Sequence, residues 1–183
     1  MHVLWIGGPP GSGKTTVARR IARRHGLRWY NADAHTWEHR DRALREGHSG
    51  AHRWEAMTPE ERVLTTTPTE LFELSLHRER GPMIAEDVRR LPPSPLVIAE
   101  GSTVMPELVA AGVADPSRAV WLVPTAEWQR ARHEEGETGG PARRNMIEYH
   151  LLIAAEVERQ AIASRIGDTL DEQDVCGARP FRR

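Results

Sequence analysis

The chain has 183 residues, of which 39% are apolar and 28% charged, and its 25 basic and 26 acidic residues give a formal net charge of −1. This composition predicts one folded domain over residues 1–183, and it argues against a disordered chain and against a strongly basic binder of nucleic acid. No apolar run reaches the length of a membrane span and no signal peptide is visible, so we expect a cytoplasmic protein without a membrane partner.

Short apolar strands alternate with helices along the chain, and two Thr-Pro-x-Glu sequences supply strong helix starts at Thr58 and Thr67. The expected strands cover residues 2–6, 27–31, 96–99 and 119–123, with a last short strand near 169–170. The expected helices cover residues 14–25, 35–45, 67–78, 82–91, 105–111, 125–133 and 141–166. We expect a loop at 47–56 and poor order in the tail at 172–183. The alternation predicts an α/β domain with a mainly parallel sheet and helices on both faces.

One segment carries a specific motif. Gly8-Pro9-Pro10-Gly11-Ser12-Gly13-Lys14-Thr15 fits G-x-x-x-x-G-K-[ST] at every position, between an apolar strand and an amphipathic helix. Glycines allow successive backbone N–H groups to curl around a phosphate, and the following helix adds the positive end of its dipole. In such a loop, spanning residues 7–16, Lys14 reaches the β- and γ-phosphates and the Thr15 hydroxyl is a ligand of Mg²⁺.

Lysine usage supports this interpretation. Of the 25 basic residues, 24 are arginine and one is lysine, Lys14. A strong preference for arginine does not explain the one lysine that remains, whereas a site for a compact ammonium group does.

At these residues the chain resembles the P-loop nucleoside-triphosphate hydrolase superfamily, and within it the small P-loop kinases, such as adenylate, shikimate and gluconate kinases and chloramphenicol phosphotransferase. The resemblance covers most of the chain in element order, although only the phosphate loop matches sharply. It implies a three-layer α/β/α fold with a five-stranded parallel sheet, the first strand central, and a short mobile lid before a late helix. It also implies ATP and Mg²⁺, with the nucleotide on Gly8, Gly11, Ser12, Gly13, Lys14, Thr15 and Thr16.

Two carboxylates follow predicted strands, where the ligand crevice of an open α/β sheet lies. Asp33 could orient an acceptor hydroxyl and take its proton, as the corresponding carboxylate does in the resembled kinases, or it could only cap the helix that follows. Glu100 could hold a Mg²⁺-bound water or the acceptor, or it could pair with a local arginine. Either residue could be the base.

Arginines flank a polar, Gly-rich stretch at 134–140 that we expect to form the lid, within about 130–144. In the resembled kinases, lid arginines stabilise the transferring phosphoryl group. The candidates are Arg130, Arg132, Arg143 and Arg144, with Arg132 expected to be catalytic and Arg130 and Arg144 to bind nucleotide.

Helices over about 34–91 are expected to cover the acceptor, and Arg40 would bind a phosphate if the acceptor carries one. The leading interpretation is an ATP-dependent kinase that phosphorylates a small molecule, with Lys14, Asp33 and Arg132 catalytic and Asp33, Arg40 and Glu100 at the acceptor. The alternatives are a regulatory or accessory nucleotide-binding ATPase and a kinase of nucleic-acid ends. The near-neutral charge makes nucleic acid the weaker partner, and the sequence leaves open the identity of the acceptor and the oligomeric state.

Overall fold

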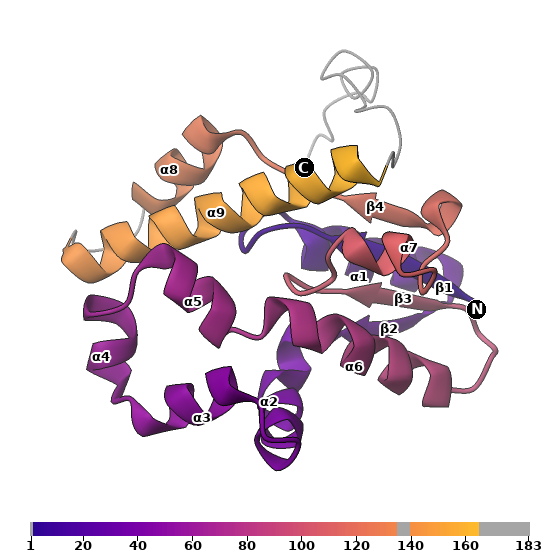
Figure 1. The fold of residues 1–183 in the computed structure, drawn as a ribbon. Coiled ribbons are helices and arrows are strands. Elements are labelled where there is room, and N and C mark those ends of the chain that lie inside the picture. The colour runs from indigo at the N-terminus through magenta and orange to yellow at the C-terminus, as the bar shows by residue number, and fades with distance from the viewer. Residues whose placement is uncertain (1, 135–139, 165–183) are drawn as a thin grey trace.

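A parallel sheet lies at the centre of the computed structural model, which describes residues 2–134 and 140–164, with the backbone alone at 132–134 (Figure 1). Its strands are β1 (Val3–Gly7), β2 (Arg28–Asn31), β3 (Val97–Glu100) and β4 (Ala119–Trp121). They are arranged in the order β2-β3-β1-β4, and every pairing is parallel. The first strand is therefore an inner strand, as expected, and the α/β class is confirmed.

The expectation of five strands is corrected to four for the part of the chain that the structure describes. The fifth strand was expected near residues 169–170, which lie outside the described residues, as does the tail at 172–183. No long apolar run specifies a strand at 169–170, so the sequence signal for it was weak.

Helices cover both faces of the sheet, which makes three layers (Figure 1). On one face α1 (Lys14–His25) buries Ala18 and Ala22 against Ile6 and Ile98. On the other face α6 (His77–Arg90) and α7 (Glu107–Ala110) pack on Trp5 and its neighbours. Because successive side chains of a strand point to opposite faces, β1 contributes to both layers, and only Leu4 of its residues is not fully buried.

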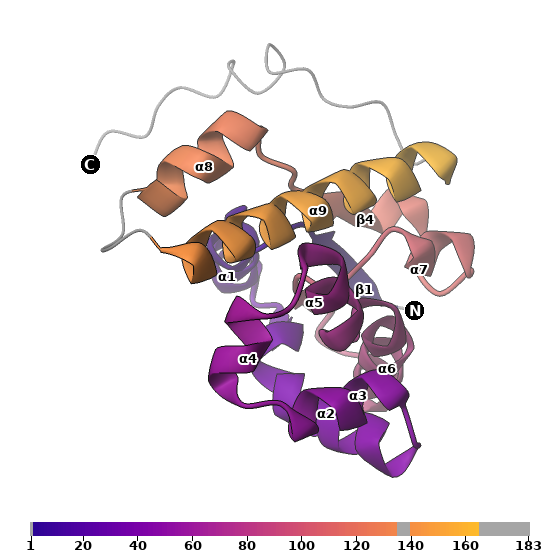
Figure 2. The ribbon, with the colours of Figure 1, turned by 60° about the vertical axis from the view of Figure 1, so that its left-hand side comes forward.

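A second group of helices extends from the carboxyl edge of the sheet (Figures 1 and 2). The chain passes from β2 through a short 3₁₀ turn (Ala32–His35) into four helices, and it returns later in two more. These are α2 (Thr36–Arg45), α3 (Ser49–Ala56), α4 (Pro59–Leu64), α5 (Pro68–Leu74), α8 (Ala126–Glu134) and α9 (Pro141–Ala163). The long α9 crosses the molecule and buries Tyr149, Ile153 and Val157 against Leu71 and Phe72 of α5.

Both predicted Thr-Pro helix starts are confirmed. Thr58 and Thr67 each accept a hydrogen bond from the backbone N–H three residues on, and Glu61 and Glu70 close the two capping boxes. Two other boundaries were wrong. The expected loop at 47–56 contains α3, and the helix expected from Pro82 begins at His77, with Pro82 inside it.

The break between α5 and α6 falls at Leu76, which has a positive φ of 57°. A left-handed conformation is costly for leucine, so it needs support from its surroundings. The Leu76 side chain supplies that support, because it is buried among Ala43, Ala51 and Met83.

Strand register brings three connecting segments to one edge of the sheet. Ile6 of β1 and Asn31 of β2 both lie opposite Glu100 of β3. Because the strands are parallel, the segments that leave their carboxyl ends emerge side by side. The phosphate loop, the turn that carries Asp33 and the segment after Glu100 therefore meet at this edge.

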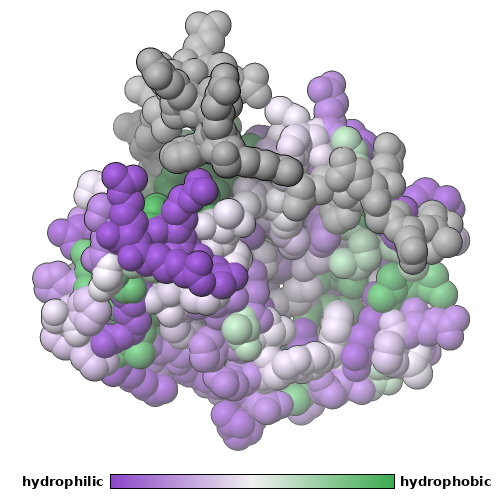
Figure 3. All heavy atoms as spheres, turned by 180° about the vertical axis from the view of Figure 1, so that it is seen from behind, coloured by the Kyte–Doolittle hydropathy of each residue, from purple (hydrophilic) through white to green (hydrophobic). Residues whose placement is uncertain are grey.

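The surface seen from behind is mostly hydrophilic around the grey atoms, and its apolar residues lie in small, separate areas (Figure 3). Among the described helices, none is both long enough and apolar enough to cross a membrane.

Candidate functional site

The loop between β1 and α1 has the backbone that the glycine pattern predicts. Gly8 has a φ of 132° and Gly13 a φ of 90°, both in the region that favours glycine. A Cβ on Gly8 would come 2.2 Å from the carbonyl oxygen of Leu122, so a side chain there is excluded on two grounds. A Cβ on Gly11 or Gly13 would meet nothing within 4 Å, so the space beside the loop is open at these two positions.

The N-terminus of α1 faces this open space without a side-chain cap. Gly13 is the N-cap residue, no side-chain hydrogen bond caps the helix, and its first turn carries no acidic residue. The first N–H groups of any α-helix lack intrahelical partners, and they attract anions. The Ser12 hydroxyl is also buried without a hydrogen-bond partner in the described structure. Open space and unsatisfied donors together fit a bound phosphate.

Lys14 lies folded against the loop. Its side chain is buried, and Nζ donates a hydrogen bond of 2.8 Å to the carbonyl oxygen of Pro9. Burial lowers the pKa of the Lys14 ammonium, whereas the nearby charges of Asp33 and Glu100 oppose that change. The lysine is thus placed between the loop and the two carboxylates that the sequence predicted.

Thr15 and Glu100 meet across the edge of the sheet. The Thr15 hydroxyl lies 3.1 Å and 3.2 Å from the two carboxylate oxygens of Glu100 and donates to them. The Trp29 indole N–H, from β2, donates to the same carboxylate at 3.2 Å. Glu100 is fully buried, and this burial raises its pKa above the ordinary value despite the two donors. Among the residues that the structure describes, Glu100 is engaged by Thr15 and Trp29, and no arginine forms an ion pair with it.

The Thr15 hydroxyl and the Glu100 carboxylate, which lie in contact, both carry oxygen atoms that can be metal ligands. Mg²⁺ is a hard cation that prefers oxygen ligands and keeps several waters, so this pair is suited to it. Within residues 2–134 and 140–164, no three His, Cys, Asp or Glu side chains gather into a metal cluster. The Thr15–Glu100 pair therefore fits a cation that takes its other ligands from nucleotide phosphates and water. Thr16, the next residue, is exposed.

Asp33 projects at the same edge, held by the segment after β3. Its carboxylate accepts hydrogen bonds from the backbone N–H of Ser102, at 3.1 Å, and from the Ser102 hydroxyl, at 2.9 Å. Asp33 does not cap the turn. The Asn31 side chain does, by accepting from the N–H groups of Asp33 and Ala34. The simple capping role for Asp33 is therefore corrected, because the turn starts two residues earlier than the sequence suggested.

Gly101 allows this approach. A Cβ at Gly101 would come 2.8 Å from the Ala32 Cβ and 3.2 Å from a carboxylate oxygen of Asp33. The Glu-Gly-Ser sequence thus places Glu100 against Thr15 and Ser102 against Asp33, with the glycine where the two segments touch.

A buried polar network fixes the turn that carries Asp33. The Tyr30 hydroxyl and His39 Nε2 both contact Asp87, at 2.6 Å and 2.9 Å. Arg80 donates from Nε to His39 Nδ1 and from Nη2 to the carbonyl oxygen of Ala32. Because Nδ1 accepts, His39 carries its proton on Nε2, and burial keeps the pKa of this imidazole below its usual value.

Arg40 is buried beneath α3 and α5. One of its terminal nitrogens donates to the carbonyl oxygen of Leu74 at 3.1 Å, and its guanidinium lies 4.4 Å from the centre of the Trp54 ring. The structure therefore places Arg40 in the interior of the helical group, between α3 and α5.

The lid arginines are only partly described. Arg130 on α8 is exposed and lies 3.9 Å from Glu148 of α9, and Arg144 is exposed near the start of α9. Arg143 turns one terminal nitrogen into the interior, where it has no partner among the described residues. The Arg132 side chain and residues 135–139 lie outside the described part of the chain, so the roles given to the lid stay predictions.

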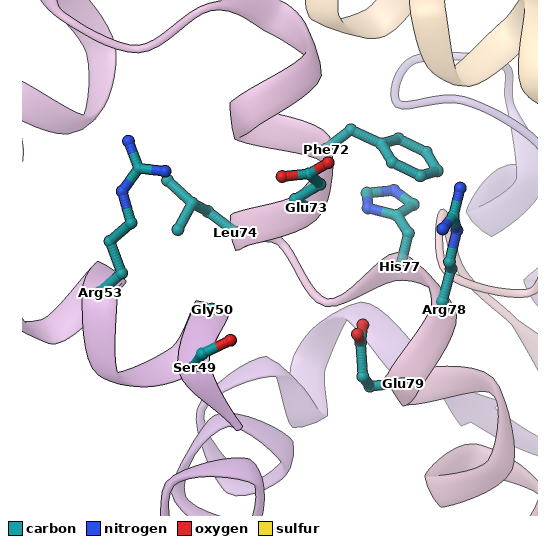
Figure 4. Close-up of a pocket in the computed structure, with 9 residues that line it drawn as sticks. All are labelled: Ser49, Gly50, Arg53, Phe72, Glu73, Leu74, His77, Arg78 and Glu79. Carbon is teal, nitrogen blue, oxygen red and sulfur yellow. The ribbon is translucent and has the colours of Figure 1, made fainter. Parts of the chain in front are cut away.

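A pocket of about 450 Å³ opens elsewhere, between α3, α5 and the N-terminus of α6 (Figure 4). In Figure 4 the rings of Phe72 and His77 lie face to face on one side of it, with their centres 4.6 Å apart. None of the residues that line this pocket belongs to the phosphate loop.

Sequence reasoning missed several contacts of the site: Trp29 on Glu100, Ser102 on Asp33, and Arg80 on the turn before Asp33. Ser102 had a usable signal, because it follows Glu100 by two residues at the expected crevice. Trp29 and Arg80 had none, since nothing in their local sequence indicates which neighbouring segment they contact.

Comparison with known proteins adds no assignment. No protein-family model matches the chain, and no curated protein matches it.

Proposed function

We propose that this protein is an ATP-dependent kinase that transfers the γ-phosphoryl group to a hydroxyl of a small-molecule acceptor. The observation that carries the proposal is the contact between Thr15, the last residue of the phosphate-loop motif, and the buried Glu100 at the end of the neighbouring strand. A glycine-rich sequence alone predicts only a turn. Here the Thr15 hydroxyl and the Glu100 carboxylate, a pair suited to Mg²⁺, lie beside the lysine of the same loop.

The roles of the phosphate loop follow from its donors. The free N–H groups at the start of α1, together with the Ser12 hydroxyl, would hold the β-phosphate. The Lys14 ammonium would move from the Pro9 carbonyl oxygen to the γ-phosphate. Thr15 and Glu100 would hold Mg²⁺, which neutralises the charge that develops on the phosphate oxygens.

Asp33 is the better candidate for the base that receives the acceptor proton. It is exposed, whereas Glu100 is fully buried and engaged by Thr15 and Trp29. Both donors of Ser102 hold the Asp33 carboxylate at the carboxyl edge of the sheet, so it needs little reorganisation to meet a hydroxyl.

ATP turnover with and without a panel of hydroxyl-bearing metabolites tests the proposal. We expect turnover that depends on an acceptor, and we expect both Lys14→Ala and Lys14→Arg to abolish it while the fold is retained by circular dichroism. The arginine variant keeps the charge but cannot fit a compact ammonium site. Turnover independent of every acceptor would instead support an ATPase, and full activity of both variants would exclude the phosphate-loop assignment.

A further inference from the structure

Ser102 places a hydroxyl of the chain itself against the proposed base. Its Oγ donates a hydrogen bond of 2.9 Å to one carboxylate oxygen of Asp33. A hydroxyl that gives its proton to a base during phosphoryl transfer must lie within about 2.6–3.2 Å of that base. Ser102 therefore already meets the distance that an acceptor hydroxyl has to meet. Its side chain is also accessible, because Ser102 is only partly buried.

The backbone connects Ser102 closely to the phosphate loop. The N–H of Gly101 donates to the carbonyl oxygen of Ile6 at 3.2 Å, directly before the loop begins. Glu100, the other neighbour of Gly101, lies 3.1 Å from the Thr15 hydroxyl. Because two residues of chain span at most about 7 Å, the Cα atom of Ser102 is within that distance of the Cα atom of Glu100. Ser102 thus lies beside the proposed magnesium ligands.

The charges of the site indicate the same arrangement. Burial lowers the pKa of the Lys14 ammonium, and the charges of Asp33 and Glu100 both oppose that change. Lys14 is therefore close enough to feel the carboxylate that Ser102 contacts. Since Lys14 would bind the γ-phosphate, this phosphate, the base and the Ser102 hydroxyl would lie together at one edge of the sheet.

Two other hydroxyls near the site have different contacts. Thr36 donates at 2.7 Å to the backbone carbonyl oxygen of Asp33, which is too weak a base to take a proton. Thr15 donates to the carboxylate of Glu100, but that carboxylate is fully buried and the Thr15 hydroxyl is the proposed ligand of Mg²⁺. Of these three hydroxyls, only that of Ser102 contacts an exposed carboxylate.

We propose that Ser102 is a site of self-phosphorylation, at which the protein transfers the γ-phosphoryl group of ATP to its own chain when no small-molecule acceptor is bound. A bond forms between Oγ of Ser102 and the γ-phosphorus, and the bond from that phosphorus to the oxygen bridging the β- and γ-phosphates breaks. The hydroxyl proton passes to the Asp33 carboxylate, and ADP leaves with the electron pair of the broken bond. Ser102 phosphorylation rests on the proposed kinase function, because it uses the same ATP site and the same base, but it requires no small molecule.

Intact-mass spectrometry of the full-length chain tests this site. The protein is incubated with ATP and Mg²⁺ in a buffer without hydroxyl compounds, and its mass is followed over time. We expect the mass of one phosphoryl group to be added, and peptide mapping to place it on Ser102. Because hydroxyl, base and phosphate loop belong to one chain, the rate constant should not depend on protein concentration.

Variants of the segment after β3 identify the acceptor hydroxyl. Ser102→Ala should take up no phosphate, whereas Ser102→Thr, which keeps a hydroxyl, should still be phosphorylated at the same position. Thr103→Val is the matched control. The Thr103 hydroxyl is 1% exposed and has no partner among the described residues, so its removal should leave both the labelling rate and the fold unchanged.

Two further variants test the chemistry. Asp33→Asn keeps the shape of the side chain but removes the base, so labelling of Ser102 should slow by about 10²-fold or more. Lys14→Ala should abolish labelling, and mixing it with the active protein should leave it unlabelled, since the transfer occurs within one chain. Circular dichroism confirms that each variant is folded.

Three results would overturn the assignment of Ser102. One is a phosphoryl group on another residue, and the second is labelling at the parental rate in Asp33→Asn. The third is no labelling of a preparation that phosphorylates a small molecule. Failure of the kinase proposal would look different, because then neither the chain nor any metabolite of the panel would take up phosphate.

Discussion

The Asp33 carboxylate combines exposure with a fixed position, because both the backbone N–H and the hydroxyl of Ser102 donate to it. Asp33→Asn keeps the shape but removes the basicity, so we expect phosphoryl transfer to fall by about 10²-fold or more with nearly unchanged ATP affinity. Steady-state kinetics at saturating ATP measures the first effect, and titration with a non-hydrolysable analogue measures the second.

Asp41→Asn is the matched control for this prediction, because Asp41 is also exposed, lies eight residues further on in α2, and loses the same charge. We expect it to keep full activity. If Asp33→Asn retained the parental rate, the base would lie elsewhere, and Glu100 would be the next residue to change.

The Trp29 indole donates a hydrogen bond to the fully buried Glu100 carboxylate, and this contact favours the charged form of the group. Removing that donor in Trp29→Phe should raise the already elevated pKa of Glu100 further, so protons compete better with Mg²⁺. We expect the Mg²⁺ concentration for half-maximal activity to rise about tenfold, the usual scale for an outer contact of a metal ligand.

This loss should be smaller at higher pH, where Glu100 is ionised even without the indole. Trp37→Phe is the control, since Trp37 is 63% exposed on α2. An unchanged Mg²⁺ requirement in Trp29→Phe would mean that Thr15 alone holds the carboxylate in place.

Among the elements, the segment that follows β3 passes close to the turn after β2. In Gly101→Ala the new Cβ would press on Ala32 and on the Asp33 carboxylate, so the turn must shift. We expect transfer to fall at least tenfold and the melting temperature to drop, while nucleotide affinity stays near the parental value, because the phosphate loop is not touched.

Gly50→Ala tests whether any added methyl group has this effect. Gly50 lies in α3, where a Cβ would meet its nearest neighbour at 3.4 Å, an ordinary contact. Alanine is a better helix former than glycine, so this variant should be as stable as the parent or more stable. Equal behaviour of the two variants would show that the Gly101 contact does not position Asp33.

The sequence predicted elements well where the signal is local. The helices that begin after Thr58 and Thr67 are predicted by residues within one turn of each threonine. The apolar runs of β1 and β3 are bounded by glycine or proline. The start of α6 was wrong because its determinant is not local: Leu76 adopts a positive φ only because residues of α2, α3 and α6 surround it.

The same distinction between local and non-local sequence signals applies to the candidate site. The phosphate loop is one contiguous motif, and its glycine conformations followed from residue type. The carboxylates followed from their positions after strands, since parallel register brings strand ends together. The partners of those carboxylates lie about 70 or more residues away in sequence, and only the folded chain shows which of the 24 arginines lies near them.

At the scale of the whole molecule, His77 links stability to pH where α5, α6 and α9 meet. Its ring is buried between Phe72 and Tyr149 and forms no side-chain hydrogen bond among the described residues. Burial lowers its pKa to about 3, although a backbone contact with Phe72 opposes the change. Arg80, His150 and Lys14 lower the pKa in the same direction. The imidazole is therefore neutral in the folded protein throughout the mildly acidic range.

In the unfolded chain a histidine is protonated as the pH falls through about 6.5, whereas His77 stays neutral in the folded chain. Stability should therefore fall as the pH drops below about 6.5, by roughly 2 kcal/mol between pH 7 and pH 5 from this residue. Denaturant melts across that range measure the effect, and His77→Phe should flatten the profile. An unchanged slope in the variant would assign the pH dependence to other groups, such as His39.

The lysine count has a consequence for chemical labelling. Arginine side chains do not react with the activated esters that acylate amines, so among 25 basic side chains this chain offers one target, and it lies in the phosphate loop. Desolvation increases the share of Lys14 in the neutral, nucleophilic form. Apart from the chain terminus, the mass that such a reagent adds to the protein would report acylation of Lys14 alone. A nucleotide that protects Lys14 would be recognised because this added mass disappears.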